Sequence, residues 1–302
     1  MRLALLLALA TSACAQPATD PAPRAKPDAD APNSARDSAS QRADSVIERP
    51  SAGAPGPSVD TLAVAAGETA VRLVVHAFPG ETAVNMLNVH DDEGTSVEAA
   101  LDVARERGGR VVEIVHTGER NLTFAVGGRR YTADPNRMFT DAGRRRTLRP
   151  QPDPAALDAL RAFADTVLAV YARAPTAVVV TLHNNTPDGY SARSYEPGAE
   201  YAGDAAAVVV RTGSDPDDFF FVTDRALYDA LVGRGFNAVL QDNAAATDDG
   251  SLSVWAAREG VPYVNVEAER GHRAEQVRMV RALVGVLAGD RQPGGRSGSG
   301  RR

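Results

Sequence analysis

Several features that commonly stabilise or localise a protein are scarce in this 302-residue chain. It has a single cysteine, Cys14, so it cannot close an internal disulfide bond, and a hydrophobic core has to stabilise any folded part. It has no excess of basic residues: the formal net charge is −6, which argues against a nucleic-acid partner, because such partners select basic faces. Beyond the amino terminus, no apolar run approaches the roughly 20 residues that a membrane-spanning helix needs.

The amino terminus has the pattern of an export signal. Arg2 is followed by apolar residues 3–10 and then by small residues up to Gln16. Two cleavage sites fit. The stretch Ser12-Ala13-Cys14 resembles a bacterial lipobox, which would give a lipid anchor on Cys14, whereas the small residues before Gln16 suit ordinary cleavage after residue 15. We therefore expect an exported bacterial protein, either periplasmic or attached to the membrane only through this lipid anchor.

One folded domain is expected between two segments of low complexity. Residues 16–58 are rich in Ala, Pro, Asp, Ser and Arg and cannot bury enough apolar surface to fold, so they predict a disordered linker. Residues 290–302 are rich in Gly, Ser and Arg and predict a disordered tail. The remaining 59–289 suffice for one hydrophobic core.

Apolar runs alternate with amphipathic segments along this domain. The runs predict strands at 70–78, 84–89, 110–116, 177–182, 219–222, 238–240 and 262–266, with a hairpin at 122–131. The amphipathic segments predict helices at 95–107, 154–173, 225–232, 251–258 and 272–287. This alternation predicts a three-layer α/β/α domain with a mixed, mostly parallel sheet.

Three short motifs, far apart in the chain, contain the residue types of a mononuclear zinc site. Asn88-Val-His90-Asp-Asp-Glu93, Leu182-His183 and Val266-Glu267 each follow an apolar run. Catalytic zinc usually takes three protein ligands of the His/His/carboxylate kind, and a further carboxylate accepts a proton from the attacking water. His90, Glu93 and His183 can be the ligands of one zinc ion per chain, and Glu267 can be the base. Glu269 is the alternative base, because strand alternation turns it to the same face.

The position of these motifs supports a shared site. His90, His183 and Glu267 are each expected just past the carboxyl end of a strand, where open α/β sheets bind ligands. A lone His-x-x-Glu pair is common in ordinary polar turns, so agreement between the motifs carries the hypothesis. Asn184 follows His183 in a polar stretch that we expect to form the rim of a substrate pocket.

The motifs and their order resemble those of the zinc carboxypeptidases, and most of all those of the succinylglutamate desuccinylase/aspartoacylase branch. His90 and Glu93 match the His-x-x-Glu pair, and Asp134-Pro-Asn136-Arg137-Met-Phe139 matches the branch's Asp-x-Asn-Arg-x-Phe signature. The segments 182–186 and 266–267 match the remaining two motifs. The resemblance covers about residues 70 to 288.

The resemblance implies further roles for polar residues. Asn136 and Arg137 would hold the carboxylate of the substrate, which suits the guanidinium because its fork donates two parallel hydrogen bonds. Arg130 would stabilise the oxyanion, with the adjacent Arg129 as the alternative. Two departures leave the substrate open. The segment 243–249 lacks the tyrosine that carboxypeptidases carry, and no further domain follows Glu267 as in aspartoacylases.

Together these patterns indicate an exported zinc hydrolase that cleaves an amide or peptide bond next to a free carboxylate. Peptidoglycan peptides are carboxylate-bearing substrates that fit the predicted location. The alternative is a lipid-anchored binding protein on the same fold, which retains the site only to capture a ligand.

Overall fold

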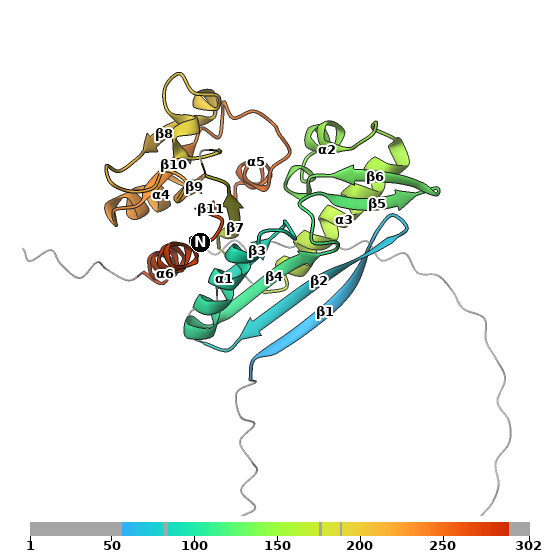
Figure 1. Ribbon diagram of the computed structural model, residues 1–302, viewed down its shortest axis with the longest axis horizontal. Coiled ribbons are helices and arrows are strands. Elements are labelled where there is room, and N and C mark those ends of the chain that lie inside the picture. Colours follow the sequence, from blue (N-terminus) through green and yellow to red (C-terminus); the bar gives the residue numbers. More distant parts are fainter. Residues whose placement is uncertain (1–55, 81–83, 175–176, 188, 290–302) are drawn as a thin grey trace, which may run out of the picture. The chain divides into compact units, whose positions relative to one another are not determined.

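A mixed sheet of nine strands forms the centre of the domain, in the order β1-β2-β4-β3-β7-β11-β9-β10-β8 (Figure 1). The computed structural model describes residues 56–80, 84–174, 177–187 and 189–289, all within the compact unit Ala52–Arg302. The predicted signal, the predicted linker up to residue 55 and the predicted tail lie outside the described residues. The strands are β1 (Ser58–Ala66), β2 (Thr69–Phe78), β3 (Val84–Asn88), β4 (Gly109–Val115), β7 (Val179–Asn185), β8 (Ala205–Val209), β9 (Phe219–Val222), β10 (Asn237–Gln241) and β11 (Tyr263–Glu269).

The strand directions confirm the predicted mixed sheet, but fewer neighbouring strands are parallel than predicted. The central neighbours β4-β3-β7-β11 are parallel, and so is the pair β9-β10. The other four neighbouring pairs are antiparallel, including β1-β2 and β8-β10 at the two edges. Parallel pairs therefore make up half of the sheet. Helical crossovers such as α1 between β3 and β4 and α4 between β9 and β10 allow parallel pairing, whereas a tight turn makes β1 and β2 antiparallel.

Helices cover both faces of the sheet, as the predicted three-layer architecture requires (Figure 1). On one face, α1 (Gly94–Arg107), α4 (Arg225–Gly233) and α6 (Arg273–Leu287) enclose a core that includes Met86, Val180 and Val266. On the other face lie α3 (Pro154–Tyr171), α5 (Leu252–Arg258), α2 (Asp141–Thr147) and a separate two-stranded sheet of β5 (Leu122–Val126) and β6 (Arg129–Ala133). None of the described helices is long and apolar enough to cross a membrane.

The local sequence explains where helix α1 stops and β4 begins. Gly108 and Gly109 both have positive φ, 82° and 127°, which side-chain-bearing residues rarely adopt. A Cβ atom on Gly109 would lie 2.4 Å from the carbonyl oxygen of Val84, so glycine also permits the close approach of β3 and β4. The predicted end of this helix at the two glycines is confirmed.

Helix α3 is hydrogen-bonded to two central strands of the sheet, β3 and β7. Asp153 caps it by accepting hydrogen bonds from the backbone N–H groups of Ala155 and Ala156. At its other end the Tyr171 hydroxyl donates to the carbonyl of Asn85 (2.9 Å) and accepts from the N–H of Val180 (3.0 Å). The two central strands β3 and β7 are thereby held together near their amino ends, away from the carboxyl ends that carry His90 and His183.

Three elements were not predicted. Strand β1 begins at Ser58, one residue before the expected domain start, and pairs along its whole length with β2. Strand β8 and helix α2 are short, and the strand consists of the residues Ala-Ala-Ala-Val-Val. Such short segments show no helical or strand periodicity, so tertiary pairing decides their conformation.

Candidate active site

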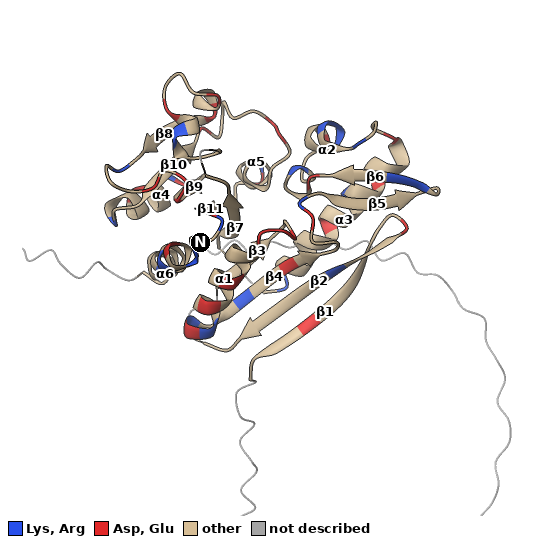
Figure 2. Ribbon diagram, viewed as in Figure 1, with Lys and Arg blue, Asp and Glu red and all other residues tan. Residues whose placement is uncertain are grey.

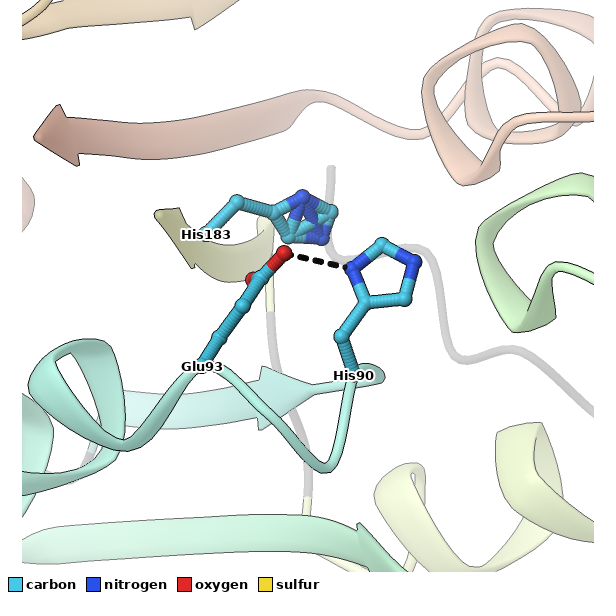
Figure 3. A group of neighbouring side chains, drawn as sticks. All are labelled: His90, Glu93 and His183. Atoms are coloured by element: carbon cyan, nitrogen blue, oxygen red, sulfur yellow. Dashed lines mark ion pairs between the residues drawn. The ribbon is translucent and has the colours of Figure 1, made fainter. Parts of the chain in front are cut away.

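His90, Glu93 and His183 converge on one point in the structure (Figure 3). His90 lies just past β3, Glu93 is the residue before α1, and His183 lies on the neighbouring strand β7. The Nδ1 atom of His90 is 2.8 Å from the Oε1 atom of Glu93, and the two imidazole rings are 5.1 Å apart between centroids. One ligand atom from each residue lies within 4.8 Å of the others. The predicted ligand set is therefore brought together and buried.

The predicted position just past a strand end holds for His90 but is wrong for the other two residues. His183 lies within β7, and Glu267 lies within β11. Their Cα atoms are register partners in the parallel pair of these strands. The strands run further than the apolar runs because the pairing continues through polar residues up to Asn185 and Glu269. Rigid backbone therefore carries both side chains.

A carboxylate lies behind His90. The Nε2 atom of His90 is 2.9 Å from Oδ1 of Asp134, which also accepts the N–H of Asn136. Burial raises the pKa of Asp134, but the hydrogen bond and charge of His90 outweigh it, and the net result is a lowered pKa. An ionised Asp134 accepts a hydrogen bond from the Nε2–H group of His90 and leaves the Nδ1 lone pair facing Glu93. Asp134 belongs to the quoted signature, but no role was predicted for it.

The unpaired atoms of the site fit a metal cation. Among the described residues Nε2 of His183 is buried without a hydrogen-bond partner, which is costly unless another group compensates. Nδ1 of His90 faces only the carboxylate of Glu93, at 2.8 Å, and a cation between these two acceptor atoms would hold them together. Burial lowers the pKa of His183 to about 4, so its ring is neutral at pH 7. Burial opposes the ionisation of Glu93, but His183, His90 and Arg120 lower its pKa to about 2. Two imidazoles and one ionised carboxylate form a donor set that suits zinc.

Glu267 is the buried carboxylate beside this centre. Burial, reinforced by the charge of Glu93, raises its pKa to about 8, and its Oε2 atom accepts a hydrogen bond from Asn265 (2.8 Å). A cation between the ligands would favour its ionised form. Glu269 is directed elsewhere, with Oε2 lying 3.8 Å from Nε2 of His272. Of the two alternatives, the structure places Glu267 on the cavity described next.

A cavity of about 750 Å³ opens in front of these residues. Glu93, His183 and Glu267 line it at one side. Asn136 and Arg137 line it as well, on a short 3-10 helix (Pro135–Arg137) from the opposite face of the sheet. The structure thus brings the expected carboxylate-docking residues to the same cavity as the candidate ligands and base.

The prediction that Arg130 lies in the active site is wrong. Arg129 and Arg130 are both exposed on β6, where Tyr131 and Ala133 face the core, and neither is among the described residues that line the cavity. Basic residues mark the far end of the β5–β6 hairpin, away from β3 and β7 (Figure 2). The strand alternation of β6 turns Arg130 to solvent.

Arg120 occupies the site instead. It lies between β4 and β5, lines the cavity, and donates from Nη1 to Oε1 of Glu93 at 2.6 Å. Sequence reasoning missed it, although Arg120 follows the apolar run of β4 closely. That is the signal which pointed to His90.

Asn184 lines the cavity, but its side chain is engaged within the protein. Its Oδ1 atom accepts the N–H of Ser96 (2.9 Å), and Nδ2 donates to the carbonyl of Ala268 and to Gln276. Its backbone N–H donates to Oε2 of Glu93 (3.1 Å). Both amide hydrogens are used, so Asn184 positions Glu93 and α1, and the predicted contact with substrate is not supported by this geometry.

Three tyrosines also line the cavity. Tyr190, Tyr195 and Tyr201 come from the segment after β7, and their rings contact one another and Phe219 or Phe221. The hydroxyl oxygens of Tyr190 and Tyr195 are 2.7 Å apart. Sequence reasoning looked for a tyrosine at 243–249 and missed these three. The sequence did contain a signal for them, because three of the chain's seven tyrosines lie within twelve residues.

No protein-family model and no curated protein matches this chain. The structure is similar to solved structures of low sequence identity. A succinylglutamate desuccinylase/aspartoacylase from Rhodobacter sphaeroides is 16% identical over 77% of this chain, with a TM-score of 0.38, and this chain spans 64% of its length. An aspartoacylase family protein from Mesorhizobium loti is also 16% identical, over 78% of this chain and 68% of its own, with a TM-score of 0.41.

A third similar structure is matched over a larger share of its own length than the first two. The murein-tripeptide amidase MpaA from Escherichia coli O157 is 17% identical over 80% of this chain and 94% of its own, with a TM-score of 0.40. The solved structures to which this chain is similar thus include the succinylglutamate desuccinylase/aspartoacylase proteins that its sequence motifs resemble.

Proposed function

We propose that this protein is an exported zinc-dependent hydrolase that cleaves an amide or peptide bond next to a free carboxylate. His90, Glu93 and His183 would hold the zinc ion. When bound, zinc supplies a Lewis acid for the carbonyl and lowers the pKa of a water molecule. The observation that carries the proposal is the convergence of two buried imidazole nitrogens and one ionised carboxylate, with Nδ1 of His90 facing Glu93 and Nε2 of His183 unpartnered among the described residues.

Glu267 is the proton carrier in this proposal. Its Oε2 atom is occupied by Asn265, so Oε1 is the free atom that accepts a proton from the attacking water. The same atom then returns the proton to the leaving nitrogen. Because the side chain is buried on a central strand, its position relative to His183 is defined by the β7–β11 register.

Two arginines act on the two ends of the substrate. Arg137 docks the free carboxylate with its guanidinium, which lines the cavity and is partly exposed. Arg120 reaches the centre at Glu93 and donates to the oxygen that becomes negative during the reaction. Export and a peptidoglycan substrate are part of the proposal on the basis of the amino-terminal signal alone.

Metal content tests the proposal directly. Protein purified without chelator should contain about one zinc per chain, and His183→Ala should lose most of it because three ligands become two. Asp134→Asn should weaken zinc binding by about 10- to 100-fold, since it replaces the charged acceptor behind His90 by a neutral amide. Zinc below about a tenth of an equivalent would remove the hydrolase proposal and favour a ligand-binding protein.

A further inference from the structure

More carboxylates than arginines line the cavity. Three arginines line it, and each lies close to a carboxylate: Arg120 to Glu93, Arg137 to Asp249, and Arg270 to Asp92. Three more carboxylates line the same cavity, namely Glu200, Asp204 and Glu267. Among the residues that the structure describes, these three form no ion pair. Apart from a bound metal ion, and with Glu267 protonated, five carboxylates therefore face three arginines in the cavity, although it contains the arginine expected to dock a carboxylate.

The pair Arg137–Asp249 presents both signs of charge to the cavity. Nε of Arg137 is 3.4 Å from Oδ2 of Asp249, and the two side chains are 37% and 39% exposed. Oδ1 of Asp249 accepts the N–H of Ser251 (2.9 Å), which holds the carboxylate in place. A ligand carboxylate that docks on Arg137 comes close to Asp249, and two like charges repel unless a cation lies between them.

Aromatic side chains line the same cavity. The charges of Arg137 and Asp249 act on the hydroxyls of Tyr195 and Tyr201, whose pKa burial raises. Both tyrosines line the cavity, together with Glu200 next to Tyr201. Aromatic faces and carboxylates are the groups that bind an ammonium ion.

We propose that the Arg137–Asp249 pair recognises a free amino-acid head group, with the carboxylate on Arg137 and the ammonium on Asp249. The inference rests on the proposed function in that Arg137 docks a carboxylate. The amide that is cleaved then joins the acyl group to the distal nitrogen of a diamino acid, so this inference moves the scissile bond of the proposed function away from the carbon that carries the docked carboxylate. An acyl amino acid whose only free group is a carboxylate is a poor ligand, because Asp249 repels it.

Two ligands that differ in one group test this. Nε-acetyllysine, as each enantiomer, has an amide and a free amino-acid head group, whereas 6-acetamidohexanoate has the same amide and carboxylate without the α-ammonium. Binding of each to the purified full-length protein is measured by NMR titration, which needs no turnover. One Nε-acetyllysine enantiomer should bind about ten- to a hundredfold more tightly than 6-acetamidohexanoate, the range of a charge-assisted hydrogen bond.

Asp249→Asn gives the decisive result. The variant should bind Nε-acetyllysine more weakly and 6-acetamidohexanoate more tightly, so that the preference falls to about one. Asp248→Asn is the matched control: it removes the neighbouring charge, which faces Thr140 and Arg258 and does not line the cavity. Its preference should equal that of the unmodified protein. Circular dichroism confirms that both variants are folded.

Three outcomes would overturn the inference. Equal weakening of both ligands by Asp249→Asn would show that Asp249 only orients Arg137. Equal affinity of the unmodified protein for both ligands, or binding of neither, would show that the cavity does not recognise the head group. Failure of the proposed function is distinct, because a protein without zinc or hydrolysis can still show the predicted preference.

Discussion

The two sides of the cavity are built differently. On the metal side, His183 and Glu267 lie on the central strands β7 and β11, and His90 follows β3 directly. On the substrate side, Arg137, Asp249 and three tyrosines come from loops and short 3-10 helices. A chemical step needs atoms held at fixed distances, which paired strands supply, whereas a substrate pocket has to match a particular molecule and varies with its loops. The comparison predicts that changes on the two sides have separable effects.

The largest effect is expected on the metal side, from Glu267→Gln. Glutamine keeps the size of the side chain but cannot accept a proton, so hydrolysis should fall by about 10² to 10⁴ while zinc remains bound. Glu269→Gln is the control, because Glu269 is directed toward His272 and should leave the rate near that of the unmodified protein. Rates on an acyl amino acid and elemental analysis of both variants check this. Full activity of Glu267→Gln would break the assignment of the base.

Arg120→Ala should have the next largest effect. Removal of an oxyanion donor lowers kcat by about 10² to 10³. Arg130→Ala, on the exposed face of β6, should change neither kcat nor KM. Steady-state kinetics of the two variants compare an arginine inside the cavity with one outside it. The reverse result would restore the sequence-based assignment to Arg130.

The smallest effect is expected on the substrate side, from Tyr195→Phe. The Tyr190 hydroxyl then loses its partner at 2.7 Å while remaining buried, which should lower the free energy of unfolding by about 1–3 kcal/mol. Zinc content should be unchanged. Urea denaturation and elemental analysis provide both values. Loss of zinc from this variant would show that the two sides are coupled, contrary to the comparison.

The part of the site that could be predicted is the part with local signals. His90 and Glu93 are three residues apart and follow an apolar run, and His183 and Glu267 end or follow similar runs. An apolar run ending in a lone polar residue is conspicuous because burial of that residue requires a reason. Arg120, Asp249 and the tyrosines carry no such signal, since polar and aromatic residues in loops are common whether or not they line a site.

The fold shows the same division. Strands and helices with long periodic patterns were predicted within a few residues, and Gly108 and Gly109 marked the end of α1. The edge strands β1 and β8 were not predicted, and the balance of parallel and antiparallel pairs was not recognised. Strand direction depends on which strands become neighbours, and that choice is made by the packing of helices on both faces.

By itself, the amino-acid sequence determined which segments are buried, in which order they follow one another, and which polar residues end them. Hydrophobic periodicity and turn residues are local properties, so they can be read along the chain. Only the tertiary structure decided that Glu267 pairs in register with His183, that Asp134 backs His90, and that Asp249 faces Arg137. These contacts join residues that are 44, 84 and 112 positions apart, and side-chain geometry, which no local pattern encodes, selects them.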